Sequence, residues 1–305
     1  MAIKSPVTHH QNVSLITRFP SERIIALYRQ DGVAVERFFK DIPAVDLYEC
    51  KDTGYRFYSP ENIFGDGQFY ADLQAKEGGE YYPHRKWEHR FAAAQIKPSQ
   101  KVLEVGAGDG FFLDILRQKG IAGLGLELND QAIVAGRAKG LDLRNEMIQD
   151  HAARHHGEYD VVCCFQVLEH IYDVKGFLEA CIKALKKGGK LIIGVPNNNP
   201  YLFKHDQWHT LNLPPHHAGL WSKNAFLQLQ KFFEIVPDRI TVEPLSHSLD
   251  QSKRWFLVQR DYHLEHHPAF GKILAAIPRP LYKLGVKLFS PFIAGRNIVA
   301  MFTRK

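Results

Sequence analysis

A glycine-rich bend close to two carboxylates is the feature of this 305-residue chain whose residue types and spacing could do chemistry. The run Val102–Phe111 reads VLEVGAGDGF, so a short apolar strand leads directly into Gly106, Gly108 and Gly110. Glycines at alternate positions permit a tight turn and let the backbone approach a ligand closely. Glu104 stands at the end of the strand beneath the bend, where its carboxylate can reach a cationic amino group on that ligand.

The spacing of these glycines is GxGxG rather than GxGxxG. Phe111 therefore occupies the position at which a dinucleotide-binding fingerprint has its third glycine, and a bulky residue there disfavours a pyrophosphate ligand. The second carboxylate, Glu127, ends the next apolar run and precedes Leu128. A carboxylate at that place can accept hydrogen bonds from both hydroxyls of a ribose. Together these features predict a nucleoside ligand that carries no pyrophosphate.

The elements that must position these residues alternate in type from about residue 101 to residue 233. Asn129, Asp173 and Ser222 are expected to cap helices, and Gly140 to end one. The expected strands are Lys101–Val105, Ala122–Leu128, Asp160–Phe165, Lys190–Val195, Glu234–Pro244 and Arg296–Phe302, and the expected helices are Phe111–Lys119, Asp130–Lys139, 173–187 and 222–233. This alternation predicts an α/β fold in which helices cover both faces of a parallel sheet, with the loops that follow the strands at one edge.

Four ordered stretches of the chain resemble successive motifs of class I S-adenosylmethionine (SAM)-dependent methyltransferases. They are Glu104–Phe111 with Glu127, then Tyr159–His170, Leu185–Leu191 and Val195–Asn197. The resemblance covers about residues 85–240 and the last strand. It implies a Rossmann-like, seven-stranded mixed sheet with an antiparallel last strand and helices on both faces, and it implies SAM as the cofactor.

The same resemblance implies which residues contact the cofactor. The residues implied for the methionine part are Glu104, Gly106, Ala107, Gly108, Gly110 and Phe111, and those implied for the ribose are Glu127 and Leu128. Asp150 and His151 are implied to contact the adenine, and Phe165, Gln166 and Val167 to line the methyl-donor site. SAM carries no phosphate, so the bulk of the phenylalanine after the bend is compatible with it.

The loop Trp208–Ser222 resembles a Pro-Pro-His-His loop of methyltransferases that act on sugars and other small molecules. Methyl transfer from a sulfonium is an in-line displacement, and an oxygen or carbon acceptor usually also needs a base. Prolines stiffen the loop, and histidine titrates near neutrality. His216 and His217 are therefore candidate general bases, and His170 is a weaker one. The alternative is that these side chains only pack in the loop or cap a helix.

The basic residues of the chain, whose net charge is +6, are unevenly distributed. After Glu265 there are seven basic residues and no acidic one. A nucleic-acid-binding surface would spread over a face or alternate with aromatic residues, so no nucleic-acid partner is predicted. Within this segment, residues 272–292 alternate basic and apolar residues. We interpret them as an amphipathic helix packed on the core, the alternative being contact with a membrane surface or with an anionic, lipid-linked acceptor.

No metal site is predicted from the sequence. His263–His267 has helical spacing suited to metal ligands, but no second cluster completes it, and Cys50 stands alone where some relatives carry zinc-binding pairs. Four cysteines are too few for a disulfide framework, and Cys163 and Cys164 lie within an apolar run. With no apolar leader and no long apolar stretch, the sequence predicts a cytoplasmic protein.

We expect an N-terminal accessory region over residues 1–80 and a methyltransferase domain over residues 81–305, with an insertion at about 245–295. Tyr81–His89 either closes over the pocket as a lid or packs as a helix. The predicted function is SAM-dependent methyl transfer to a small-molecule acceptor, a carbohydrate or natural-product hydroxyl, with a lipid-linked acceptor as a variant of it.

Two alternatives belong to other classes of protein. An NAD-dependent oxidoreductase is disfavoured by the glycine spacing and by Phe111. A non-catalytic SAM-binding protein is disfavoured because Glu104, Glu127 and the full glycine set are all retained.

Overall fold

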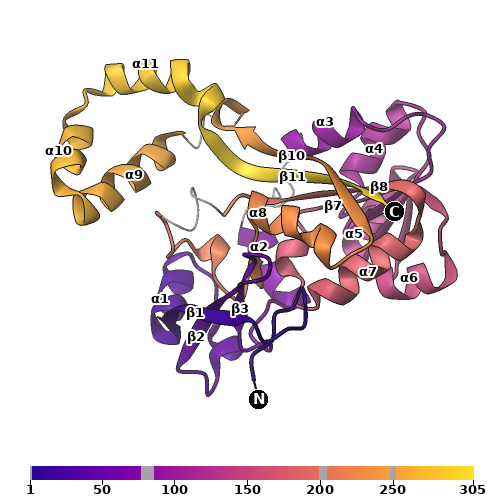
Figure 1. The fold of residues 1–305 in the computed structure, drawn as a ribbon, viewed down its shortest axis with the longest axis horizontal. Coiled ribbons are helices and arrows are strands. Elements are labelled where there is room, and N and C mark those ends of the chain that lie inside the picture. The colour runs from indigo at the N-terminus through magenta and orange to yellow at the C-terminus, as the bar shows by residue number, and fades with distance from the viewer. Residues whose placement is uncertain (1, 77–85, 199–204, 248–251) are drawn as a thin grey trace.

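A mixed seven-stranded sheet forms the centre of the structure (Figure 1). The computed structural model describes residues 2–76, 86–198, 205–247 and 252–305. In spatial order the strands are β10 (Ile235–Pro244), β11 (Ala294–Arg304), β8 (Leu185–Pro196), β7 (Tyr159–Phe165), β4 (Val102–Val105), β5 (Gly123–Glu127) and β6 (Asp142–Asn145). β11 is antiparallel to both of its neighbours, while β8, β7, β4, β5 and β6 are mutually parallel. The predicted Rossmann-like α/β fold with an antiparallel last strand is confirmed.

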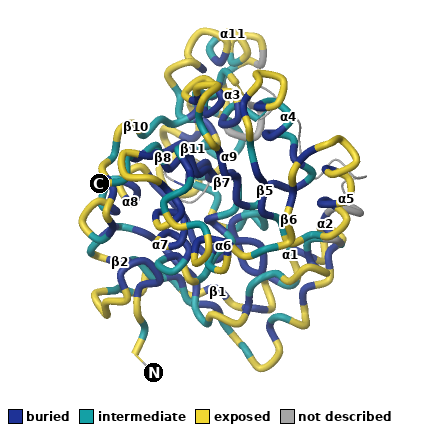
Figure 2. Tube along the Cα trace, turned by 90° about the vertical axis from the view of Figure 1, so that its right-hand side faces the viewer, coloured by how far each residue is buried: buried dark blue, intermediate teal, exposed yellow. Residues whose placement is uncertain are grey.

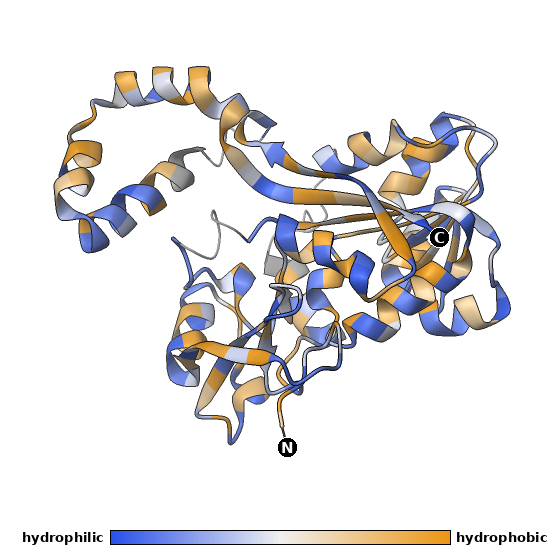
Figure 3. Cartoon of the chain, in the orientation of Figure 1, coloured by the Kyte–Doolittle hydropathy of each residue, from blue (hydrophilic) through white to orange (hydrophobic). Residues whose placement is uncertain are grey.

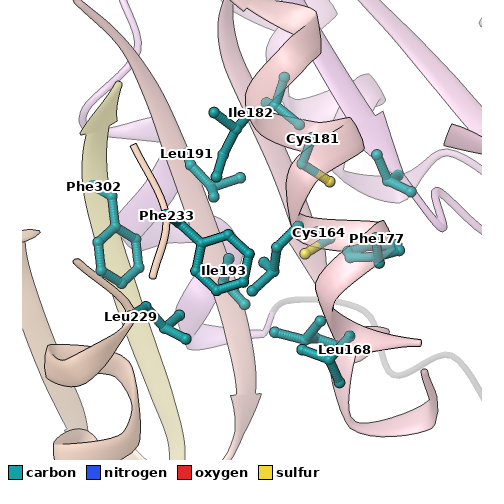
Figure 4. Packing of buried hydrophobic residues seen from close by; sticks show 14 of the residues in the cluster. Cys164, Leu168, Phe177, Cys181, Ile182, Leu191, Ile193, Leu229, Phe233 and Phe302 are labelled. Carbon is teal, nitrogen blue, oxygen red and sulfur yellow. The ribbon is translucent and has the colours of Figure 1, made fainter. Parts of the chain in front are cut away.

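Helices cover both faces of this sheet. One face carries α3 (Trp87–Ala93), α4 (Phe111–Gln118) and α5 (Asp130–Ala138), and the other carries α6 (Ile148–Arg154), α7 (Val174–Ala184) and α8 (Lys223–Gln228). Successive side chains of a strand point to opposite faces of the sheet. Cys163 therefore packs with the first group of helices, and Cys164 packs with the second. Cys164 and Cys181 lie among apolar neighbours (Figure 4), and all four cysteines are free and buried. The sheet itself is the most deeply buried part of the molecule (Figure 2).

The three predicted caps are confirmed. Asn129 accepts hydrogen bonds from the backbone N–H groups of the first turn of α5, and Asp173 and Ser222 do the same for α7 and α8. One predicted helix end is wrong, because α7 stops at Ala184 rather than at residue 187. Leu185 is fully buried and pairs with Tyr159, so the chain is already extended there.

Residues 142–155 form two elements that the sequence did not reveal. The edge strand β6 buries only Leu143, so it lacks the apolar run that marks the other strands. The segment after it, for which the sequence predicted no element, forms α6, which buries Ile148, His151 and Ala152 against the sheet.

The N-terminal region builds a second sheet of four strands in the order β1-β2-β3-β9. Its elements are β1 (Val13–Pro20), α1 (Ser21–Gln30), the 3-10 turn η1 (Glu36–Phe39), β2 (Ala44–Cys50), β3 (Arg56–Ser59) and α2 (Gly67–Lys76), and its fourth strand is β9 (Gly219–Leu220). β9 belongs to the loop Trp208–Ser222, which carries His216 and His217 and is called the histidine-containing loop below. This loop is therefore part of both the N-terminal region and the region of the central sheet. A Cβ at Gly219 would lie 1.7 Å from the hydroxyl of Tyr55, so only glycine fits this junction.

The insertion between β10 and β11 forms a helical arm that extends away from the sheet (Figure 1). We define this helical arm as α9 (Ser252–His266), α10 (Pro268–Ala276), α11 (Arg279–Phe289) and the 3-10 turn η7 (Ser290–Phe292). The interpretation of residues 272–292 as a helix packed on the core is wrong. Leu281, Leu284 and Leu288 are exposed, and α11, along which apolar and polar residues alternate, lies at the outside of the molecule (Figures 2 and 3). No helix of the described residues is long and apolar enough to cross a membrane.

Candidate functional site

A cavity of about 1390 Å³ lies at the edge of the sheet where the parallel strands end. The glycine bend after β4 forms part of its wall through Gly106, Ala107 and Gly108. Gly106, Gly108 and Gly110 have φ values of 72°, 55° and 80°, which side chains rarely adopt. The sequence had placed the bend at this edge, and the structure leaves its backbone accessible from the cavity.

Glu104 lies on the floor of the cavity with its carboxylate unpaired. Its side chain is buried, and among the described residues its Oε2 has no hydrogen-bond partner. Burial raises the pKa of Glu104 well above its ordinary value, and the nearby charge of Glu127 raises it further. A buried carboxyl of this kind is ready to pair with a cationic group, because that charge would satisfy the orphan oxygen.

Glu127 holds the far side of the glycine bend in place. Its Oε2 accepts a hydrogen bond from the backbone N–H of Gly108 at 2.8 Å. Its Oε1 accepts from the backbone N–H groups of Leu128 and Asn129 at 2.8 and 2.9 Å. Each carboxylate oxygen can accept more than one hydrogen bond, so the side chain orders the bend and retains capacity for the hydroxyls of a ligand.

The assignment of Asp150 and His151 to the adenine requires correction. Neither residue lines the cavity, whereas Met147, Ile148 and Gln149, directly before them in the chain, do. His151 is a fully buried residue of α6, and its ring nitrogens bond to the carboxylate of Glu146 at 2.9 Å and to the hydroxyl of Tyr159 at 2.8 Å. The apolar wall therefore comes from the start of α6, one turn earlier than the sequence had suggested.

Phe165, Gln166 and Val167 line the cavity at the end of β7, as expected for a donor site. Gln166 has a positive φ of 57°, a conformation that costs free energy for a non-glycine residue and is found mostly at functional sites. Its amide Nε2 donates to Oε1 of Glu88 at 3.2 Å, which helps to hold the side chain against the cavity wall. Glu88 is fully buried on α3 and was not singled out from the sequence.

The three candidate bases His170, His216 and His217 meet in one cluster on the cavity wall. Their rings lie 4.7 to 5.2 Å apart between centroids, although they come from two loops. One nitrogen from each ring lies within 4.8 Å of the others, a spacing at which a metal ion could also be held. The sequence had predicted no metal site.

Burial changes the acid–base chemistry of this cluster. It lowers the pKa of His170 to about 4 and those of His216 and His217 well below the ordinary value, so the three imidazoles are neutral at physiological pH. Burial raises the pKa of the adjacent Glu169 to about 8. The Oε1 of Glu169 lies 3.8 Å from Nε2 of His170, and neither carboxyl oxygen has a hydrogen-bond partner among the described residues.

The N-terminal region holds the histidine-containing loop by its backbone. Tyr28 donates its hydroxyl to the carbonyl oxygens of Thr210 and Leu213 at 2.7 and 2.9 Å. Tyr58 donates to the carbonyl oxygen of Asn212 at 2.8 Å. No sequence signal pointed to these contacts, because each joins residues more than 150 positions apart. The proposed lid Tyr81–His89 lies outside the described residues up to position 85.

The chain is similar to known methyltransferases in sequence and in structure. The methyltransferase domain family matches residues 79–233, which is more than half of the chain. The chain therefore belongs to this family, and the site identifies it as a class I SAM-dependent methyltransferase with SAM as its cofactor.

Two ubiquinone biosynthesis O-methyltransferases, from Escherichia coli (strain K12 / DH10B) and Shigella boydii serotype 18, are each 32% identical to it over 106 residues. That segment is 33% of this chain and 44% of each relative, so the chain spans less than half the length of the curated relatives it matches. A SAM-dependent methyltransferase from Archaeoglobus fulgidus superposes with a TM-score of 0.48 at 14% identity, covering 77% of this chain and 100% of the other.

The described residues fit this cofactor. The orphan carboxyl of Glu104 suits the amino group of the methionine part, Glu127 suits the ribose hydroxyls, and the wall at Met147–Gln149 suits the adenine. When bound, SAM supplies an electrophilic methyl group on a sulfonium.

Proposed function

We propose that this protein transfers the methyl group of SAM to a hydroxyl oxygen of a small molecule. The observation that supports this most is that the glycine bend and the histidine cluster line the same cavity. A cofactor held at the bend and an acceptor held at the histidines would then meet within one cavity, where the acceptor oxygen and the methyl group can be aligned for in-line displacement.

The histidine cluster supplies the proton chemistry of this proposal. In the reaction a carbon–oxygen bond forms at the acceptor, its O–H bond breaks, and the sulfonium becomes a neutral thioether. The proton passes to the neutral imidazole of His216 or His217, the candidate bases of the loop. Their low pKa values make imidazolium short-lived in this cluster, so the proton passes on to solvent, and Glu169, whose raised pKa of about 8 keeps its carboxyl largely protonated at neutral pH, is not the acceptor.

The acceptor we propose is a carbohydrate or natural-product hydroxyl. The cavity is larger than a cofactor alone requires, and beyond the histidines its wall carries polar side chains at His209, Asn212 and Arg296. Polar groups of this kind can orient a hydroxylated acceptor. The curated relatives named above are O-methyltransferases, which favours oxygen over nitrogen or carbon as the atom methylated.

We further propose that residues 1–80 act as a scaffold for the acceptor side of the cavity. The hydroxyls of Tyr28 and Tyr58 fix the backbone of the loop just before the two histidines. This would make the accessory region necessary for methyl transfer but not for cofactor binding, because the glycine bend and Glu127 belong to the central sheet.

The test is a pair of measurements on the whole chain. Calorimetric titration with SAM and separately with NAD should show binding of SAM alone. Transfer of labelled methyl from SAM should then be measured on nucleotide sugars and on phenolic hydroxyl compounds. Binding of NAD in place of SAM would overturn the proposal, as would methylation of amines in preference to hydroxyls.

A further inference from the structure

The helical arm exposes several large apolar side chains on α10, α11 and η7. Leu281 is 61% exposed, and Phe292 at the end of the arm is 87% exposed. The remaining members of the set are Phe270, Ile273, Leu284, Leu288 and Phe289. Exposed apolar side chains that gather on one element mark an interaction surface, because isolated ones are normal and contiguous ones are not.

The apolar face of α11 is distinct from the face by which the helix packs. Tyr282 stacks against Phe256 of α9 with ring centroids 4.0 Å apart, and Val286 is buried. Leu281, Leu284 and Leu288 recur at the three- and four-residue spacing of another helical face and remain exposed. α11 therefore packs within the arm through one face and leaves the face with the three leucines, which we call the apolar stripe, exposed.

The exposed charges on α10 and α11 are positive, and the acidic residues of the arm, Asp261 and Glu265, lie on α9. Lys272, Lys283 and Lys287 are exposed on α10 and α11. The sequence has no acidic residue from position 266 to position 305. An apolar stripe flanked by cations matches the outer layer of an anionic bilayer, where apolar side chains enter the lipid and the ammonium groups contact phosphates and carboxylates.

Both ends of the arm are anchored at the cavity. His247 just before it and Arg296 just after it line the cavity wall. A partner surface bound to the arm would therefore lie beside the site of methyl transfer.

We propose that α10, α11 and η7 dock on the surface of an anionic lipid membrane, with the apolar stripe in the lipid and the lysines at the headgroups. The helices lie in the plane of the interface, since none of the described helices is long and apolar enough to span it. This proposal does not depend on the acceptor, because it concerns where the protein binds and not which hydroxyl it methylates.

Vesicle co-sedimentation of the full chain tests the proposal. We expect binding to vesicles with about one third phosphatidylserine and roughly 30-fold weaker binding to pure phosphatidylcholine. Salt at about 0.5 M should weaken the binding to anionic vesicles, because it screens the lysines. The triple variant L281S/L284S/L288S should bind anionic vesicles at least about 30-fold more weakly than the wild type.

Matched variants separate docking from general effects. V134S/V236S removes apolar side chains that are exposed on α5 and β10, away from the arm, and should leave vesicle binding unchanged. K283Q/K287Q should lose the preference for anionic lipid, whereas K223Q/K231Q, also at exposed lysines, should keep it. Thermal unfolding checks that each variant is folded.

Two results would overturn the proposal. One is equal vesicle binding by the wild type and the triple leucine variant. The other is a wild-type dimer, seen by light scattering, that the triple variant converts to a monomer without any vesicle binding by either protein, because the stripe would then be covered by a second copy of the chain. SAM binding by the triple variant should match the wild type, so a failure of methyl transfer would not be confused with a failure of docking.

Discussion

Nδ1 of His170 lies 2.7 Å from the backbone carbonyl oxygen of His216. Because a carbonyl can only accept, the ring must carry its proton on Nδ1, which leaves a lone pair on Nε2. That nitrogen is the one 3.8 Å from Glu169. The hydrogen bond thus fixes both the tautomer and the orientation of a ring at the point where two separate loops meet.

The first prediction concerns the histidines of the loop. His217→Ala and His216→Ala should each be tested in single-turnover methyl transfer, and the variant that removes the base should lose roughly 100-fold in rate. SAM affinity should not change, because the cofactor contacts lie at the bend. His156→Ala, at an exposed position on the far side of α6, is the matched control and should retain full activity. A double variant that transfers methyl at the wild-type rate would reject the base role.

The second prediction concerns Glu104. Burial raises the pKa of Glu104, so its carboxyl is protonated to a higher pH in the free protein than an exposed glutamate, and a cationic amino group beside it would lower that pKa. SAM binding should therefore release a proton, and the affinity should rise with pH. Calorimetry in buffers of different ionisation enthalpy measures this release.

Glu104→Gln cannot release that proton and should bind SAM about 10- to 100-fold more weakly. Asp114→Asn, on the exposed side of the following helix, should behave as the wild type. Equal proton release by the wild type and by Glu104→Gln would contradict the assignment.

The third prediction concerns the support of the loop by Tyr28. Tyr28→Phe leaves the carbonyl oxygens of Thr210 and Leu213 without this donor and should lower the free energy of unfolding by about 1–3 kcal/mol. Methyl transfer should fall while SAM binding is kept, because only the acceptor side loosens. Denaturant unfolding measures the first effect and calorimetry the second. Tyr48→Phe, whose hydroxyl is only partly buried, should be close to neutral in both.

The fourth prediction concerns pH and His89. Burial lowers the pKa of His89 to about 3, whereas an unfolded chain protonates histidine near 6.5. The unfolded state therefore binds more protons in this window, and the free energy of unfolding falls as the pH is lowered from 6.5 towards 3. Between pH 6.5 and pH 5 this single group accounts for about 1.6 kcal/mol.

His89→Phe should remove that slope, because the ring already lies among Phe111, Phe112 and Phe165 and no longer titrates. Buried carboxyls such as Glu169 act in the opposite direction above pH 4.5, so the quantity to measure is the difference between wild type and variant. An exposed histidine treated in the same way, His156→Phe, should show no difference.

The sequence was most informative where the signal is local. The turn at Gly106–Gly110 follows from glycine's access to positive φ, and the capping by Asn129 follows from an oxygen that reaches two backbone N–H groups nearby. The strands of the sheet centre were visible because both faces are buried, which requires nearly continuous apolar residues. β6 could not be predicted for the same reason, since an edge strand that buries one leucine has no continuous run of apolar residues.

By itself, then, the sequence determined the fold class, the cofactor bend with Glu104 and Glu127, and the identity of the three histidines. The tertiary structure decided that these histidines line one cavity with Glu169, that Met147–Gln149 rather than Asp150 and His151 line it too, and that the leucines of α11 are exposed. The physical reason is the separation along the sequence between the atoms that determine each feature. Caps and glycine turns depend on atoms a few residues apart, whereas burial, pKa and the meeting of two loops depend on which distant segments pack together.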